Sequence, residues 1–263
     1  MDTSGYLTMR FVRTERILTV YFGDPARMDA PDQAIHEELG RLFRDLRDER
    51  EARAVVLTGD GPGFFTGLKD PSGSLLWQRE QGLAVIEAGR RVARGIVWDL
   101  LDVPIPVVAA LNGDALGLGA TIALLCDAVF ISEAAVIADP HVRIGVAAGD
   151  GGAAIWPLIV GPVLAKRHLL TGDPVTAAEA ARLGIATRVD PAGEVLAEAS
   201  GFAGRLAAGP PLAVSYTKLA VNRLVKDSIA GAFEQGLDHE MLTFLSRDMA
   251  AALTDTEPEF HGR

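Results

Sequence analysis

The stretch "IPVVAALNGDALGLGATIALLCD" (residues 105–127) indicates the fold class of this chain. It begins with an apolar segment at 105–111, turns through glycines at 113, 117 and 119, and continues as the alanine- and leucine-rich segment 120–127. Such a pattern is typical of a buried strand that leads through a glycine turn into a helix. The stretch therefore predicts one strand–turn–helix unit of an α/β protein.

The same design occurs earlier, in "AVVLTGDGPGFFTGLKD" (54–70). Further strands are expected at 17–22 and 128–132, because these runs are rich in β-branched and aromatic residues. Helices are expected after Pro31, where apolar residues recur at helical spacing, and over about 75–101. Strands and helices thus alternate up to about residue 190, which predicts an α/β fold.

The last part of the chain has a helical pattern. Helices are expected at 196–209, 212–225 and 229–245, with a break at Pro210 and Pro211. We therefore expect a core over residues 1–195 and a helical region over 196–263.

Composition restricts the possible partners. The 263 residues are 49% hydrophobic and carry a formal charge of −10, which disfavours binding to nucleic acid or to an anionic membrane. With Cys126 as the single cysteine, the chain can form neither an internal disulfide nor a cysteine-rich metal site. The first residues show no signal-peptide pattern, and the apolar runs are shorter than a membrane span. We expect a cytoplasmic protein.

The two glycine-rich turns predict an oxyanion hole. The first amides of a helix lack intrahelical partners, so the backbone N–H groups of Leu68 and Leu118 can bind an oxygen that becomes negative. A structural alternative is that Gly113, Gly117 and Gly119 only allow a helix to pack closely on a strand, but two related turns favour the functional interpretation. The turns lack the third glycine of a dinucleotide fingerprint, the end of a P-loop and a nucleophile elbow.

Six segments along the chain carry a resemblance to a known family. They are "VVLTGDGPGFFTGLKD" (55–70), "PVVAALNGDALGLGATIALLCD" (106–127), "DPHVRIGVAAGDGG" (139–152), "LLTGDPVTAAEAARLGIATRV" (169–189), "YTKLAVN" (216–222) and "PEFHGR" (258–263). In this order they resemble the crotonase superfamily, also called the enoyl-CoA hydratase/isomerase family. The resemblance implies a spiral of ββα units, a C-terminal helical trimerisation region and acyl-CoA substrates. It also implies an oxyanion hole at Leu68 and Leu118.

The sequence departs from the hydratase pattern at its acid–base positions. The resemblance places the two glutamates of hydratases at Thr121 and His141, and neither residue is a carboxylate. A threonine hydroxyl does not titrate near neutral pH, although it can hold a water, whereas an imidazole can carry a proton. Asp150 lies where other branches carry a functional aspartate, and His36 resembles a histidine of the diketone-hydrolase branch. Structural alternatives are a solvated His36, a turn-capping Asp150 and a structural His141.

The resemblance also implies residues that bind the substrate. They are Lys69, which can meet a phosphate, Asp70, Gly117, and Phe260, which can stack on an adenine. Asp255 and Glu257 stand where members often carry a basic stretch, which weakens the expected CoA contact. We expect no metal ion and no redox cofactor, because neither metal nor hydride chemistry is implied.

These observations lead to three functional hypotheses. The first is an enoyl-CoA hydratase/isomerase-like enzyme, in which Leu68 and Leu118 hold a thioester enolate while His141, assisted by Asp150, moves the proton. The second is a C–C bond hydrolase of the retro-Claisen type, which cleaves a 1,3-dicarbonyl or a β-keto-acyl-CoA. The third is a catalytically silent homologue that serves as an oligomeric partner. The resemblance implies a homotrimer or a dimer of trimers.

Overall fold

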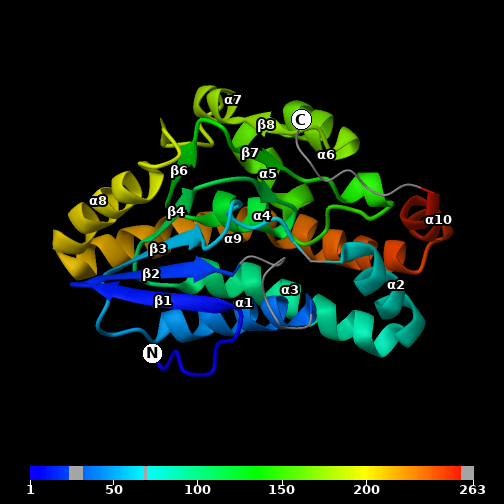
Figure 1. Cartoon of the computed structure of the whole chain (residues 1–263), viewed down its shortest axis with the longest axis horizontal. Helices are drawn as coiled ribbons and strands as arrows, with labels where there is room; N and C mark the ends of the chain where they lie inside the picture. Colours follow the sequence, from blue (N-terminus) through cyan, green and yellow to red (C-terminus); the bar gives the residue numbers. More distant parts are fainter. Residues whose placement is uncertain (24–31, 68–69, 256–263) are drawn as a thin grey trace.

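The computed structural model describes residues 1–23, 32–67 and 70–255. Its centre is a six-stranded sheet, with helices on both faces (Figure 1). The strands follow the order β1 (Met9–Thr14), β2 (Ile17–Phe22), β3 (Ala54–Gly59), β4 (Val107–Leu111), β6 (Ala128–Ser132) and β9 (Arg188–Asp190). The β1–β2 hairpin is antiparallel, and the other neighbours are parallel.

The strands β3, β4 and β6 are mainly apolar because both faces of the sheet are covered. Side chains alternate between the two faces of a strand. Val55 and Leu57 therefore pack into the core with helices α1 (Asp32–Arg47) and α3 (Leu83–Asp102). Ala54 and Val56 pack on the other face, against helix α8 (Val195–Ala208).

A second, three-stranded sheet carries one wall of the candidate site. It pairs β5 (Ala115–Leu116) with β7 (Val136–Ala138), and β7 with β8 (Val175–Thr176). The helices α4 (Leu118–Leu125) and α5 (Gly152–Val160) begin close to the ends of β5 and β7 and contact each other. The remaining elements are α2 (Pro71–Gln81), the short 3₁₀ helix η1 (His141–Ile144), α6 (Pro162–Thr171), α7 (Ala177–Arg182) and α10 (Arg247–Asp255).

The longest helix, α9 (Pro211–Phe244), packs across α3 and α5 (Figure 1). Phe233 of α9 is fully buried, and its ring meets that of Trp98 edge to face at 5.4 Å. This contact ties the C-terminal part of the chain to the core, and it places the end of α9 beside the segment that follows β7.

The structure confirms the α/β fold with a helical C-terminal part. It also confirms the strands at 17–22, 54–59 and 128–132. The expected helix over 75–101 is instead two helices, α2 and α3, which are separated at Gly82, where φ is +82°. The expected helices 212–225 and 229–245 are instead the single helix α9, because residues 226–228 contain neither glycine nor proline and Ser228 bonds Leu224 within the helix.

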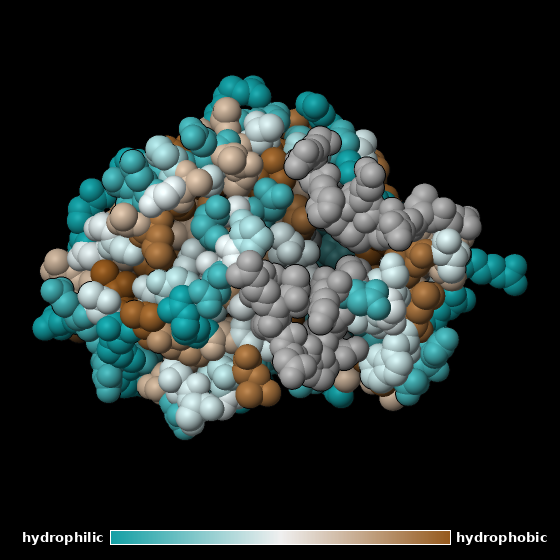
Figure 2. Space-filling model, viewed as in Figure 1, coloured by the Kyte–Doolittle hydropathy of each residue, from teal (hydrophilic) through white to brown (hydrophobic). Residues whose placement is uncertain are grey.

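The structure bears on three further points. The division at residue 195 stays a prediction, and α8, which begins there, packs on the sheet. Among the described helices, none combines the length and the apolar character that crossing a bilayer requires. Hydrophobic and hydrophilic residues are interspersed over the face seen in Figure 2.

Candidate active site

The two glycine-rich turns after β3 and β4 lie side by side. The Asn112 side chain accepts a hydrogen bond from the Gly59 N–H at 2.9 Å and donates one to the Gly61 carbonyl at 2.8 Å. In addition, the Leu116 N–H donates to the Phe65 carbonyl at 2.9 Å. The turns therefore face each other, as a hole built from one amide of each turn requires.

Helix α4 supplies the amide of one turn. Its N-cap is Gly117, whose φ of +53° favours glycine and whose N–H donates to the Ala138 carbonyl. The buried Leu118 follows as the first helical residue, where the helix offers its N–H no acceptor. Leu68 lies outside the described residues, so the two-donor hole stays a proposal.

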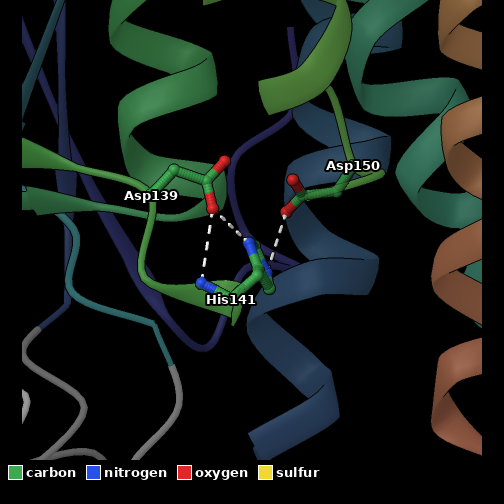
Figure 3. A group of neighbouring side chains, drawn as sticks. All are labelled: Asp139, His141 and Asp150. Atoms are coloured by element: carbon green, nitrogen blue, oxygen red, sulfur yellow. Dashed lines mark hydrogen bonds and ion pairs between the residues drawn. The ribbon is translucent and has the colours of Figure 1, made fainter. Parts of the chain in front are cut away.

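His141 stands between two carboxylates at the beginning of η1 (Figure 3). Its Nδ1 lies 2.6 Å from Asp139 Oδ1, and its Nε2 lies 3.7 Å from Asp150 Oδ2. A Cβ at Gly117 would come within 3.1 Å of His141 Cε1, so the imidazole lies directly beside the start of α4. The structure thus brings His141, Asp150 and Gly117 together.

Two residues of this cluster were missed by the sequence reasoning. Asp139 directly follows β7 and is buried; its spacing of two residues from His141 was the available signal. Glu240 is also buried, on α9, and no local motif marks it. A Cβ at Gly149, next to Asp150, would come within 2.6 Å of Glu240 Cβ, so α9 brings this carboxyl group to the loop.

Helix α9 also fixes the loop that carries Asp150. A Cβ at Gly149 would overlap the Gly236 carbonyl oxygen, so loop and helix backbones are in direct contact. The Thr243 hydroxyl accepts a hydrogen bond from the Ala147 N–H at 3.1 Å and donates one to the Glu240 carbonyl at 2.7 Å. The position of Asp150 therefore depends on a helix about ninety residues further along the chain.

Burial and mutual charge shift the pKa values of the cluster. Burial opposes protonation of His141, but the charges of Asp139 and Asp150 outweigh it and raise its pKa well above 6.5. Burial raises the pKa of Asp150 to about 6, although the charge of His141 acts in the opposite direction. Burial and the charge of Asp150 raise the pKa of Glu240 well above its usual 4.5. Each of these three groups therefore retains its proton to higher pH than in the unfolded chain.

We expect the variant Asp150→Asn/Glu240→Gln to gain stability relative to the wild type as pH rises from 4 to 7. An acid whose pKa is raised by folding stabilises the native state only while it is protonated, so the wild type loses this contribution as pH rises through the folded pKa. The relative gain should be on the order of 1–3 kcal/mol. Urea unfolding at pH 4, 5.5 and 7 measures it, and a constant difference between the two proteins would contradict the assigned shifts.

Thr121 shows why this site differs from a pair of glutamates. Its side chain is fully buried on α4, and its Oγ1 has no hydrogen-bond partner among the described residues. A Cβ at Gly151 would overlap Thr121 Cγ2, so the hydroxyl lies beside the loop of Asp150. Of the two family positions, only that of His141 can carry a proton at neutral pH.

The other predicted residues are placed as follows. His36 is half-buried on α1, and its ring meets that of Phe65 edge to face at 6.4 Å. Asp70 accepts a hydrogen bond from the Gly73 N–H and caps α2, so a substrate contact from it stays a prediction. Lys69 and Phe260 lie outside the described residues.

The cluster is compact enough to raise the question of a metal ion. Asp139, His141 and Asp150 offer ligand atoms that all lie within 4.8 Å of one another. The contact of Asp139 with His141 Nδ1 is common to metal-ligating and to catalytic histidines. Since the resemblance described above implies no metal ion, we interpret the group as an acid–base cluster.

Comparisons with known proteins agree with this architecture. Residues 13–256 match the family model described as Enoyl-CoA hydratase/isomerase. The chain is 30% identical to a crotonyl-CoA hydratase of Syntrophomonas wolfei over 95% of each sequence. It superimposes on the crystal structure of an enoyl-CoA hydratase/isomerase from Mycobacterium paratuberculosis with a TM-score of 0.88 and 32% identity, over 95% of this chain and 98% of the other.

A third match confirms the resemblance to diketone hydrolases. The structure of a β-diketone hydrolase from the cyanobacterium Anabaena sp. PCC 7120, bound to (S)-3-oxocyclohexyl acetic acid, superimposes with a TM-score of 0.82 and 28% identity. That match covers 91% of this chain and 95% of the other. On the family model, the relatives and the shared fold, the chain belongs to the enoyl-CoA hydratase/isomerase family of the crotonase superfamily and is an enzyme of its lyase and isomerase type.

Proposed function

We propose that this enzyme forms the enolate of a carbonyl substrate, with an acyl-CoA thioester as the leading substrate class, and that His141 carries the proton. The observation that carries the proposal is the position of His141: its ring lies beside the first turn of α4 and between two buried carboxylates. A proton carrier next to a predicted oxyanion site is the arrangement that enolate chemistry requires.

This proposal gives a role to the predicted residues other than His36. The backbone amides of Leu68 and Leu118 hold the substrate oxygen as it becomes negative, and Gly117 leaves room for the imidazole. Asp150 stabilises the protonated form of His141. The hydroxyl of Thr121, which has no hydrogen-bond partner within the described ranges, holds a water. His36 contacts the ring of Phe65, and a direct role for it in the reaction stays a prediction. Lys69, Asp70 and Phe260 bind the CoA portion, which is part of the substrate, and no other cofactor takes part.

A second candidate is hydrolysis of a C–C bond in a 1,3-dicarbonyl or a β-keto-acyl-CoA. Its support is that His141 is the one proton carrier at the two family positions, since Thr121 does not titrate. Hydration with two glutamates divides proton transfer between two groups, whereas this hydrolysis can use a single base. The similarity to the Anabaena β-diketone hydrolase also supports hydrolysis.

The steps of this second reaction balance with a single histidine. His141 takes a proton from water, and the water oxygen bonds to one carbonyl carbon. The bond from that carbon to the central carbon then breaks, and its electron pair forms an enolate held by the backbone amides. Protonated His141 returns the proton to the central carbon, which gives a carboxylic acid and a ketone or thioester.

A panel of three substrates from two classes distinguishes the candidates. Crotonyl-CoA is followed by the loss of its conjugated absorbance, and a cyclic 1,3-diketone and acetoacetyl-CoA are followed by the release of acid. We expect turnover of one class that exceeds the other by at least about 100-fold in kcat/KM, which corresponds to more than 2.7 kcal/mol of transition-state preference. If purified, folded enzyme turns over none of these substrates, the silent-homologue hypothesis replaces both.

Assembly and location complete the proposal. A homotrimer or a dimer of trimers is supported by the apolar surface near the start of α9, a shallow groove of about 610 Å³. It is lined by Ala213, Tyr216, Thr217, Ala220, Val221 and Leu224. A cytoplasmic location is supported by the single, reduced cysteine, Cys126.

A further inference from the structure

Asp139 contacts His141 more closely than any other carboxylate of the cluster does. Its side chain is fully buried, and its Oδ1 lies 2.6 Å from the ring Nδ1 and 3.4 Å from the backbone nitrogen of His141. Asp150, by comparison, lies 3.7 Å from the other ring nitrogen. One oxygen of Asp139 thus accepts a hydrogen bond from the backbone N–H of His141 and lies within hydrogen-bond distance of its ring Nδ1, which restricts the rotation of the imidazole.

The start of α5 is shaped around the same carboxylate. A Cβ at Gly152, the first residue of α5, would overlap Asp139 Oδ2, so this position has no room for a side chain. Oδ2 is buried without a hydrogen-bond partner among the described residues. The N-terminal end of α5 favours a negative charge there, because the helix dipole is positive at that end. Among the described residues, the hydrogen-bond partners of the Asp139 side chain are thus the ring and the backbone of His141.

We propose that Asp139 is the positioning residue of His141, which it holds as the Nδ1–H tautomer so that Nε2 is the reacting nitrogen. Nε2 then faces Asp150, while the ring edge lies beside Gly117 and the first turn of α4. A carboxylate that fixes the tautomer and orientation of an imidazole has this role in histidine-based catalysis generally. The inference rests on the proposed function of His141 and adds to it the group that selects the reacting nitrogen.

The tautomer is tested first on the full-length wild-type enzyme, without substrate. Histidine labelled with ¹⁵N is followed by NMR above the pH at which the ring of His141 loses its proton, and the variant His141→Gln assigns its signal. We expect Nδ1 to carry the proton. If Nε2 carries it instead, the proposal is overturned, whatever reaction the enzyme catalyses.

Asp139→Asn tests the consequence for catalysis. We expect kcat to fall by at least about 10-fold, and by as much as roughly 10⁴-fold, while KM changes little. The groups that face His141 are Asp139, Asp150 and Glu240, and all three favour its protonated form. Removing one of these charges should therefore shift the acid limb of the pH–rate profile to lower pH. The matched control is Asp173→Asn, which removes an exposed carboxylate that pairs with Arg143 of η1.

A second variant changes no polar group. Gly152→Ala displaces the Asp139 carboxylate, so it should reproduce the loss of rate, and it should add little when combined with Asp139→Asn. If either variant lowers the melting temperature but leaves both the tautomer and the acid limb unchanged, Asp139 is merely structural and the proposal is overturned. A further outcome separates the two proposals. If the wild type holds the Nδ1–H tautomer and Asp139→Asn lowers the pKa of His141, but no activity depends on His141, the proposed function fails and the positioning role stands.

Discussion

Replacing His141 with glutamine is expected to lower kcat by about 10²- to 10⁴-fold, which is the usual contribution of a positioned acid–base group. Glutamine retains a polar side chain of similar reach, but it cannot take up or release a proton near neutral pH. Thr121 cannot replace the lost function, because its hydroxyl does not titrate there either. The measurement is steady-state turnover of the substrate that the panel identifies, at the pH of maximal rate.

The matched control for this variant is His239→Gln. His239 is exposed on α9, one residue from Glu240, so the control changes the same residue type on the helix that borders the site. We expect its turnover to equal that of the wild type. Turnover by folded His141→Gln at the wild-type rate would remove His141 from the mechanism, and it would indicate that Asp150 or Glu240 carries the proton.

Gly149→Ala is expected to damage both stability and activity. The added Cβ would overlap the carbonyl oxygen of Gly236, so the loop and helix α9 must separate. Forcing a methyl group into such a contact costs about 1–3 kcal/mol in the free energy of unfolding. Asp150 is the next residue, and a displacement of about 1 Å at a reacting group can reduce the rate by roughly 100-fold. Urea unfolding and kcat/KM measure the two effects.

Gly231→Ala is the control for this substitution. Gly231 is an exposed residue of the same helix, and a Cβ there would have no neighbour within 4 Å. Alanine favours a helix over glycine by about 1 kcal/mol, so this variant should be slightly more stable and fully active. If Gly149→Ala instead behaves like Gly231→Ala, the loop does not depend on α9 for its position.

The two predictions concern one physical feature, a proton carrier surrounded by buried acids from distant segments. Asp139, Asp150 and Glu240 come from the end of β7, the loop before α5 and helix α9. Their charges favour a protonated His141, and burial raises the pKa values of Asp150 and Glu240. The site can therefore hold and return a proton from one side of the substrate, which is what the proposed enolate chemistry needs.

The strands were predictable because their signals are local. Runs such as "AVVLTG" (54–59) and "AVFIS" (128–132) lie between turns and are buried on both faces, so their composition alone marks them. Helix boundaries were harder to predict. The pattern of 226–228 appeared to separate two helices, but nothing in that segment breaks hydrogen bonding, and packing on α3 and α5 keeps α9 continuous.

The sequence by itself determined the α/β class, the two glycine-rich turns and the family, and it predicted Thr121 and His141 at the positions of the hydratase glutamates. These properties depend on short segments, because the residue types and their spacing within a segment reflect whether it is buried and where the backbone turns. Only the tertiary structure decided which groups surround His141. Glu240 lies about a hundred residues away and Asp139 had no recognised motif, so their roles arise from the docking of α9 on Gly149 and of α5 on Asp139. Burial next to other charges, which shifts the pKa values of His141, Asp150 and Glu240, exists only after these contacts have formed.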